Sequence, residues 1–142
     1  MRILLLVALL AVQPAMARTP PVQVEDATIA WVPGLVMPHA AFVRLTNTGE
    51  HSLRLTGARS DDFARIEFQR PSRSAFTMWD PLSLPRLIEP DRTLTFRPDG
   101  PRMMLFVQSG RLEPGDTADI QLEFQGFDPL PVTFTVRKVS PY

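Results

Sequence analysis

The run that decides the fold is Asp99-Gly100-Pro101-Arg102-Met103-Met104-Leu105-Phe106, which continues into Val107. It has the pattern of a turn followed by a strand that is apolar on both faces, because successive side chains of a strand point to opposite sides. Met103 and Met104 therefore face opposite ways. A strand of this kind is expected near the centre of a sheet, with both faces covered. Pro101 can precede it only at the strand start, so Arg102 should lie at the open end of the domain, which we call the mouth.

Three further segments alternate between apolar and polar residues with a period of two, which is the pattern of half-buried strands. Their apolar faces are Ile66 and Phe68 in residues 64–69, Ile120, Leu122 and Phe124 in residues 117–124, and Val132, Phe134 and Val136 in residues 131–137. Turn-forming residues separate the segments, and the 15 prolines argue against long helices. The sequence therefore predicts an all-β fold, a Greek-key β-sandwich of cupredoxin-like or immunoglobulin-like layout.

Residues 1–17 have the order of a secretory signal peptide. One charge, Arg2, precedes an apolar core from Ile3 to Val12, and the small-residue run Ala15-Met16-Ala17 follows. The apolar core is shorter than the roughly 20 residues that a membrane-spanning helix requires. We expect cleavage after Ala17, a single domain formed by residues 18–142, and a location in the periplasm or otherwise outside the cytoplasm, without an integral membrane segment.

Charge and cysteine content exclude several kinds of site. Basic and acidic residues number 15 each, so no excess charge attracts the chain to nucleic acid. The sequence contains no cysteine, which excludes a thiolate zinc site and a cysteine nucleophile. A site for a soft metal would have to be built from methionine and histidine.

Three other stretches follow a recognisable order and spacing: Val24–Pro33 with its Ala-Trp pair, Ala40–Gly49 leading into a turn, and Leu112–Thr117. Together with residues 66–69, 76–80 and 99–106, they resemble the periplasmic copper chaperones called PCu(A)C over nearly the whole of residues 18–142. The resemblance implies a cupredoxin-like β-sandwich and a Cu(I) carrier that supplies a periplasmic copper protein or oxidase subunit.

In that family a strand ends in His, Met follows about eleven residues later, and a glycine-containing turn leads into His-x-Met. The resemblance places these ligand positions on Gln69, Asp80, Arg102 and Met104. Of these four residues only Met104 has a side chain of a type that binds copper. An amide oxygen and a carboxylate suit a soft ion poorly, and an arginine repels any cation. Arg102 and Asp80 could instead form an ion pair across the mouth, with Gln69 completing the hydrogen bonds.

If copper is retained, the sequence offers an atypical set of ligands: Met104 and Met78, with His39 and Met37 contributing from the Met37-Pro38-His39 loop. Met103 is expected to be a core residue, because alternation turns it away from Met104.

No motif of a hydrolase, zinc protease, phosphate-binding loop or dinucleotide site is present, so we do not expect an enzyme. Two functions stay open. The first is a monomeric Cu(I)-binding copper-chaperone-like protein with an atypical Met-rich site. The second is a metal-free exported β-sandwich that binds another protein.

Overall fold

The computed structural model describes residues 18–34 and 38–139, so the expected signal peptide and Met37 lie outside the described residues. The described part contains ten strands and no helix. The strands are β1 (Val22–Trp31), β2 (His39–Asn47), β3 (Leu53–Arg59), β4 (Phe63–Pro71), β5 (Trp79–Pro81), β6 (Arg86–Ile88), β7 (Thr93–Phe96), β8 (Arg102–Gln108), β9 (Thr117–Phe124) and β10 (Leu130–Lys138). None of the described segments is a helix long and apolar enough to cross a membrane.

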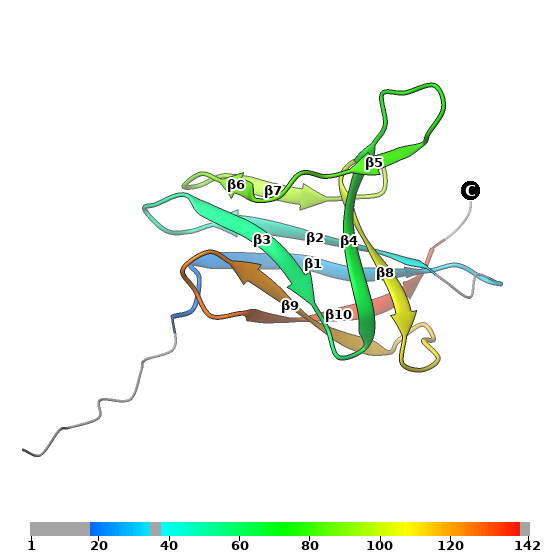
Figure 1. Cartoon of the computed structure of the whole chain (residues 1–142). Coiled ribbons are helices and arrows are strands. Elements are labelled where there is room, and N and C mark those ends of the chain that lie inside the picture. Colours follow the sequence, from blue (N-terminus) through cyan, green and yellow to red (C-terminus); the bar gives the residue numbers. More distant parts are fainter. Residues whose placement is uncertain (1–17, 35–37, 140–142) are drawn as a thin grey trace, which may run out of the picture.

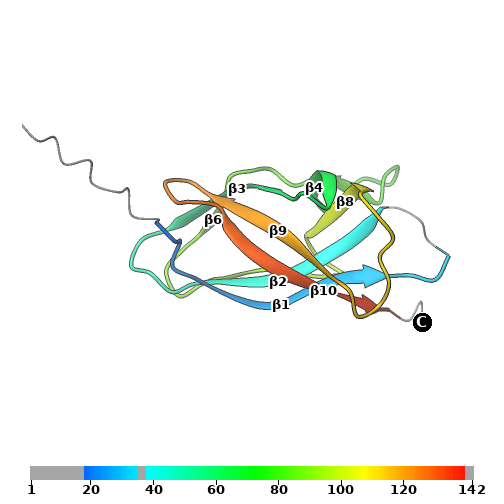
Figure 2. The same ribbon diagram turned by 90° about the horizontal axis from the view of Figure 1, so that it is seen from below.

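The strands form one continuous sheet in the order β5-β4-β8-β2-β1-β10-β9-β3-β6, and β7 also pairs with β2. The sheet curls over itself, so that β1 and β2 lie on one side of the core and β3 and β4 on the other (Figure 2). Parallel pairing occurs between β1 and β10, and the other pairs are antiparallel. The expected all-β, cupredoxin-like or immunoglobulin-like sandwich is confirmed.

The core consists of the inward faces that alternation predicts. Phe68 of β4 and the predicted apolar faces of β9 and β10 are buried, and Ile66 packs against them. Strand β8 lies between β4 and β2, and both Met103 and Met104 are buried, which confirms a central strand covered on both faces. Met103 belongs to the core cluster, as expected.

Asn47 closes one end of the sandwich. Its fully buried side chain donates to the carbonyl oxygens of His51 (2.8 Å) and Ile88 (2.9 Å) and accepts from the Gly49 N–H (2.9 Å). A buried amide that satisfies three hydrogen bonds in this way ties the end of β2 to the end of β6.

At the other end, β4 and β5 form a hairpin that rises above the rest of the sheet (Figure 1). The register pairs Gln69 with Pro81, Arg70 with Asp80 and Pro71 with Trp79. We call residues 72–78, which connect the two strands, the hairpin tip. The hairpin and the start of β8 carry the residues that the sequence assigns to the mouth.

Candidate metal centre

Gln69 and Arg102 occupy opposite positions on β4 and β8, where antiparallel residues share a face of the sheet. The guanidinium of Arg102 donates to Gln69 Oε1 from Nε at 3.2 Å and from Nη2 at 3.0 Å. The expected hydrogen bonding between these two residues is therefore present. It joins two of the four positions at which the resemblance implies copper ligands.

The third member of this cluster is Trp79 of β5. The guanidinium carbon of Arg102 lies 3.5 Å from the centroid of the Trp79 ring, which is a close cation–π contact. Arg102, Gln69 and Trp79 thus form one unit, which we call the arginine cluster. The ring and the amide hold the positive charge in one place at the mouth.

Asp80 does not join the cluster, and the expected Arg102–Asp80 ion pair is wrong. The register places Asp80 opposite Arg70, and Asp80 Oδ2 lies 3.4 Å from Arg70 Nη2. Neighbouring residues of a strand point to opposite faces, so when Trp79 faces Arg102 the carboxylate of Asp80 turns away. Sequence spacing alone indicated Asp80 as the partner of Arg102. The only sequence signal for the observed contact was the aromatic residue beside it, Trp79.

The electrostatics of the arginine cluster oppose a metal ion. Burial lowers the pKa of Arg102 from its ordinary value, since a half-buried guanidinium loses part of its hydration. Arginine nevertheless stays charged near neutral pH. A cation placed among these residues would meet a fixed positive charge at contact distance.

Met104 shares the face of Arg102, because it lies two residues further along β8. Its neighbours across the strands are Ala40 and Glu67, and its side chain is 7% exposed. The Met104 side chain is thus buried. The carboxylate of Glu67 pairs with Arg65 at 3.1 Å.

His39 lies on the other face of the sheet. It is opposite Leu105, a core residue, and is only 2% exposed. Its Nδ1 atom has no hydrogen-bond partner within the described ranges. Strand register therefore separates this imidazole from Met104, although the two residues belong to neighbouring strands.

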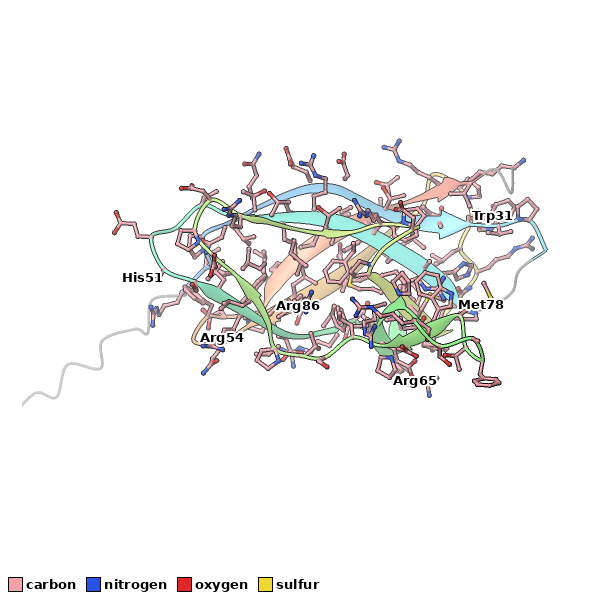
Figure 3. The ribbon with its side chains drawn as sticks, turned by 90° about the horizontal axis from the view of Figure 1, so that it is seen from above. Trp31, His51, Arg54, Arg65, Met78 and Arg86 are labelled. Carbon is pink, nitrogen blue, oxygen red and sulfur yellow. The ribbon has the colours of Figure 1, made fainter. Side chains whose placement is uncertain are left out.

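Met78 is on the hairpin tip and is 81% exposed. It lies at the same end of the molecule as Trp31, the last residue of β1 (Figure 3). Met37, the fourth proposed ligand, lies outside the described residues. Across residues 18–34 and 38–139, no three His, Asp or Glu side chains come together as a possible metal site.

The fold and the mouth together define a cupredoxin-like β-sandwich whose mouth carries an arginine cluster. The chain belongs to the LpqE-like family, whose model, described as "Putative lipoprotein LpqE-like", matches residues 22–136. This range includes nearly all of the sheet and every residue of the arginine cluster.

Solved structures with a similar fold include a PCuAC domain and the DR1885 protein. The copper-bound PCuAC domain from PmoF2 is 18% identical, with a TM-score of 0.68 over 87% of this chain and 97% of that domain. The solution structure of Cu(I)-bound DR1885 from Deinococcus radiodurans is 27% identical, with a TM-score of 0.65 over 84% of this chain and 80% of that protein. Apo-DR1885 is 29% identical, with a TM-score of 0.64 over 98% and 93% of the two chains. A comparison with curated protein sequences finds no significant match.

Proposed function

We propose that this protein is an exported, copper-chaperone-like domain in which the copper position has become a metal-free binding site. The observation that carries the proposal is the arginine cluster: Arg102 donates twice to Gln69 and stacks on Trp79. A guanidinium is a donor with no lone pair to offer a metal. Its fixed charge suits a partner with carboxylate or carbonyl oxygens instead. The proposal includes no catalytic step.

A second candidate function is a Cu(I) carrier of the same fold, which delivers its ion to a periplasmic copper protein or oxidase subunit. Met104 favours this candidate, because a buried thioether at a matched ligand position suits a soft ion. Met78, His39 and Met37 would supply the other donors. The copper-bound relatives support it as well, since they share the fold.

To act as this carrier, the protein would have to bring its proposed copper ligands closer to one another than they lie in this structure. Met78 is exposed on the hairpin tip, while His39 faces the core on the far side of the sheet from Met104. Convergence of these donors would require rearrangement of β2 or of the hairpin. The metal-free site requires no such change, and we therefore place it first.

Export is part of the proposal and rests on the signal-like residues 1–17 and on the lipoprotein family. We propose that the mature chain starts at Arg18.

A competition titration with a Cu(I) chelator distinguishes the two candidates. The metal-free site predicts no binding by the purified protein, with Met104→Leu and Met103→Leu behaving alike. The carrier predicts about one equivalent of Cu(I), with binding lost in Met104→Leu and retained in Met103→Leu, since only Met104 shares the face of Arg102. Tight binding that depends on Met104 would overturn the metal-free proposal.

A further inference from the structure

Arg102 differs in its surroundings from the other arginines that the structure describes. Among them only Arg70 and Arg102 are partly buried, and the rest are exposed. Arg70 forms an ion pair with Asp80, whereas no carboxylate of the described residues lies within ion-pair distance of Arg102. Arg102 is therefore the one described arginine that has lost part of its hydration without gaining a negative partner. A group that neutralises this charge would be favoured.

The hydrogen bonds of Arg102 leave one side of its guanidinium free. A guanidinium carries five N–H donors in a planar fork. Nε and Nη2, which share one side, both donate to Gln69 Oε1, and Nη1 has no partner in the described part of the chain. In that part the buried polar side-chain atoms without a partner are His39 Nδ1 and Gln108 Oε1, so Nη1 is not buried. The Nη1/Nη2 side thus remains available to a ligand.

Trp79 and Gln69 hold this free side in place. The Trp79 ring lies against one face of the guanidinium, with 3.5 Å between the guanidinium carbon and the ring centroid. A hydrogen-bonded ligand would approach in the plane of the guanidinium, so the ring does not obstruct it. Because Arg102 is already fixed, it would lose little conformational entropy on binding. Two parallel N–H groups on a fixed planar edge match the two oxygens of a carboxylate.

The charges of the hairpin favour a ligand group with a single negative charge. Its carboxylates are already engaged within the same molecule, Glu67 by Arg65 at 3.1 Å and Asp80 by Arg70 at 3.4 Å. The uncompensated charge of the arginine cluster is therefore that of Arg102 alone. A carboxylate would neutralise it, and a neutral carbonyl would not. A phosphate group, with a charge of about −1.5 to −2 at pH 7, would leave an excess of negative charge beside Glu67.

We propose that the Nη1/Nη2 side of Arg102 binds one carboxylate group through two parallel N–H···O hydrogen bonds. This inference rests on the proposed function, in which the arginine cluster is the binding site, and it names the chemical group that the site recognises. The carboxylate can belong to a small organic acid or to a polypeptide. For a polypeptide, Met78 offers apolar surface beside the site, because it directly precedes Trp79 and is 81% exposed.

Titration of the purified protein with sodium acetate at constant ionic strength tests the proposal. NMR signals of the Arg102 N–H groups and of the Trp79 indole N–H report on the site. We expect saturable shifts with a Kd of about 1–100 mM, which is weak because the ligand makes one contact. An absence of saturable shifts would overturn the proposal.

Two substitutions separate recognition of the carboxylate from a structural role of Arg102. Arg102→Gln removes the donors and should weaken acetate binding, followed at Trp79, by at least about tenfold. Gln69→Glu keeps the shape and the accepting oxygen but neutralises Arg102 from within the molecule, so it should weaken binding to a similar extent. Arg59→Gln is the matched control, because exposed Arg59 donates to Gln121 at 3.1 Å on other strands, and it should leave binding unchanged. Acetate binding that survives Gln69→Glu would overturn the proposal.

The source of the carboxylate is distinguished by two capped tripeptides, Leu-Glu-Leu and Leu-Gln-Leu. Binding of Leu-Glu-Leu at least about tenfold tighter than acetate would support the site and assign it to a polypeptide ligand. Equal affinities would support the site and assign it to small organic acids. Equal binding of the two tripeptides, or tighter binding of inorganic phosphate than of acetate, would overturn the choice of a carboxylate.

The proposed function and this inference fail in different ways. Tight Cu(I) binding that depends on Met104 would refute the proposed function. A protein that binds neither Cu(I) nor acetate would refute this inference alone.

Discussion

In the function that we propose, Arg102 is the residue that separates this chain from a copper chaperone of the PCu(A)C type. The resemblance assigns a copper ligand to its position on β8, but its guanidinium bonds to Gln69 and stacks on Trp79. Of the residues assigned to the mouth from the sequence, Gln69, Arg102 and Met104 share a face of the sheet, as alternation and family spacing together predict.

Trp79 could not be predicted from spacing. The chain between Gln69 and Trp79 crosses the hairpin tip, where serine and threonine side chains form hydrogen bonds, and the length and conformation of this connection fix which residue of β5 pairs with which residue of β4. If that register shifted by one residue, Asp80 instead of Trp79 would lie on the face of Arg102. The sequence does not reveal this choice, so position 80 appeared to be the partner.

Asn47 gives a residue-scale prediction. Asn47→Ala removes a fully buried amide and leaves the carbonyls of His51 and Ile88 and the Gly49 N–H without their partner. The free energy of unfolding should fall by about 2–4 kcal/mol. Denaturant unfolding measures this loss. Thr48→Ala, at an exposed neighbour, should change it by less than about 0.5 kcal/mol, and equal effects of the two substitutions would refute the role of Asn47.

At the scale of elements, strands whose residues alternate clearly could be predicted and the short strands could not. Strands β4, β9 and β10 cover the segments that alternate in the sequence. Strands β5 and β6 have three residues each, and prolines at positions 81 and 85 flank or end them. So short a segment shows no periodicity, and its pairing is decided by neighbours that are distant in the sequence.

Strand β8 gives the element-scale prediction. Met103 is fully buried in the core cluster between β4 and β2, so Met103→Ala should lower the free energy of unfolding by about 2–4 kcal/mol. Met103→Leu keeps the volume and should cost less than about 1.5 kcal/mol. Thermal or denaturant melts provide both values. A Met103→Ala protein as stable as wild type would mean that β8 is not part of the core.

For the whole molecule, we expect the sheet and its core to fold without a metal ion. The buried cluster includes residues from most of the strands, and the described residues contain no cluster of three metal-binding His, Asp or Glu groups. We expect the thermal transition to be the same with and without a chelator, unlike that of small domains that need zinc to fold. Collapse of the transition on chelation would show that a metal is structural.

Processing is a second prediction for the whole chain. The Ala15-Met16-Ala17 run predicts cleavage before Arg18. Intact-mass analysis and N-terminal sequencing of protein recovered from the periplasmic fraction should give a chain that begins at Arg18. An uncleaved species in the membrane fraction would refute this expectation.

The central claim is that the arginine cluster occupies the copper position, and it is tested most directly by restoring the two imidazoles. Gln69→His/Arg102→His replaces an opposed Arg–Gln pair by two histidines beside Met104 and removes the repelling charge. The chain offers a matched control in Arg59 and Gln121, a second Arg–Gln pair in register on β3 and β9 with a hydrogen bond of 3.1 Å. Arg59→His/Gln121→His makes the same change in composition away from the mouth.

The measurement is the Cu(I) affinity of these proteins in a competition titration. We predict no detectable Cu(I) binding by the wild type or by the control, and binding of about one equivalent by Gln69→His/Arg102→His, at least about tenfold tighter than either. Tight binding of one Cu(I) by the wild type, with no gain in the double variant, would contradict the account.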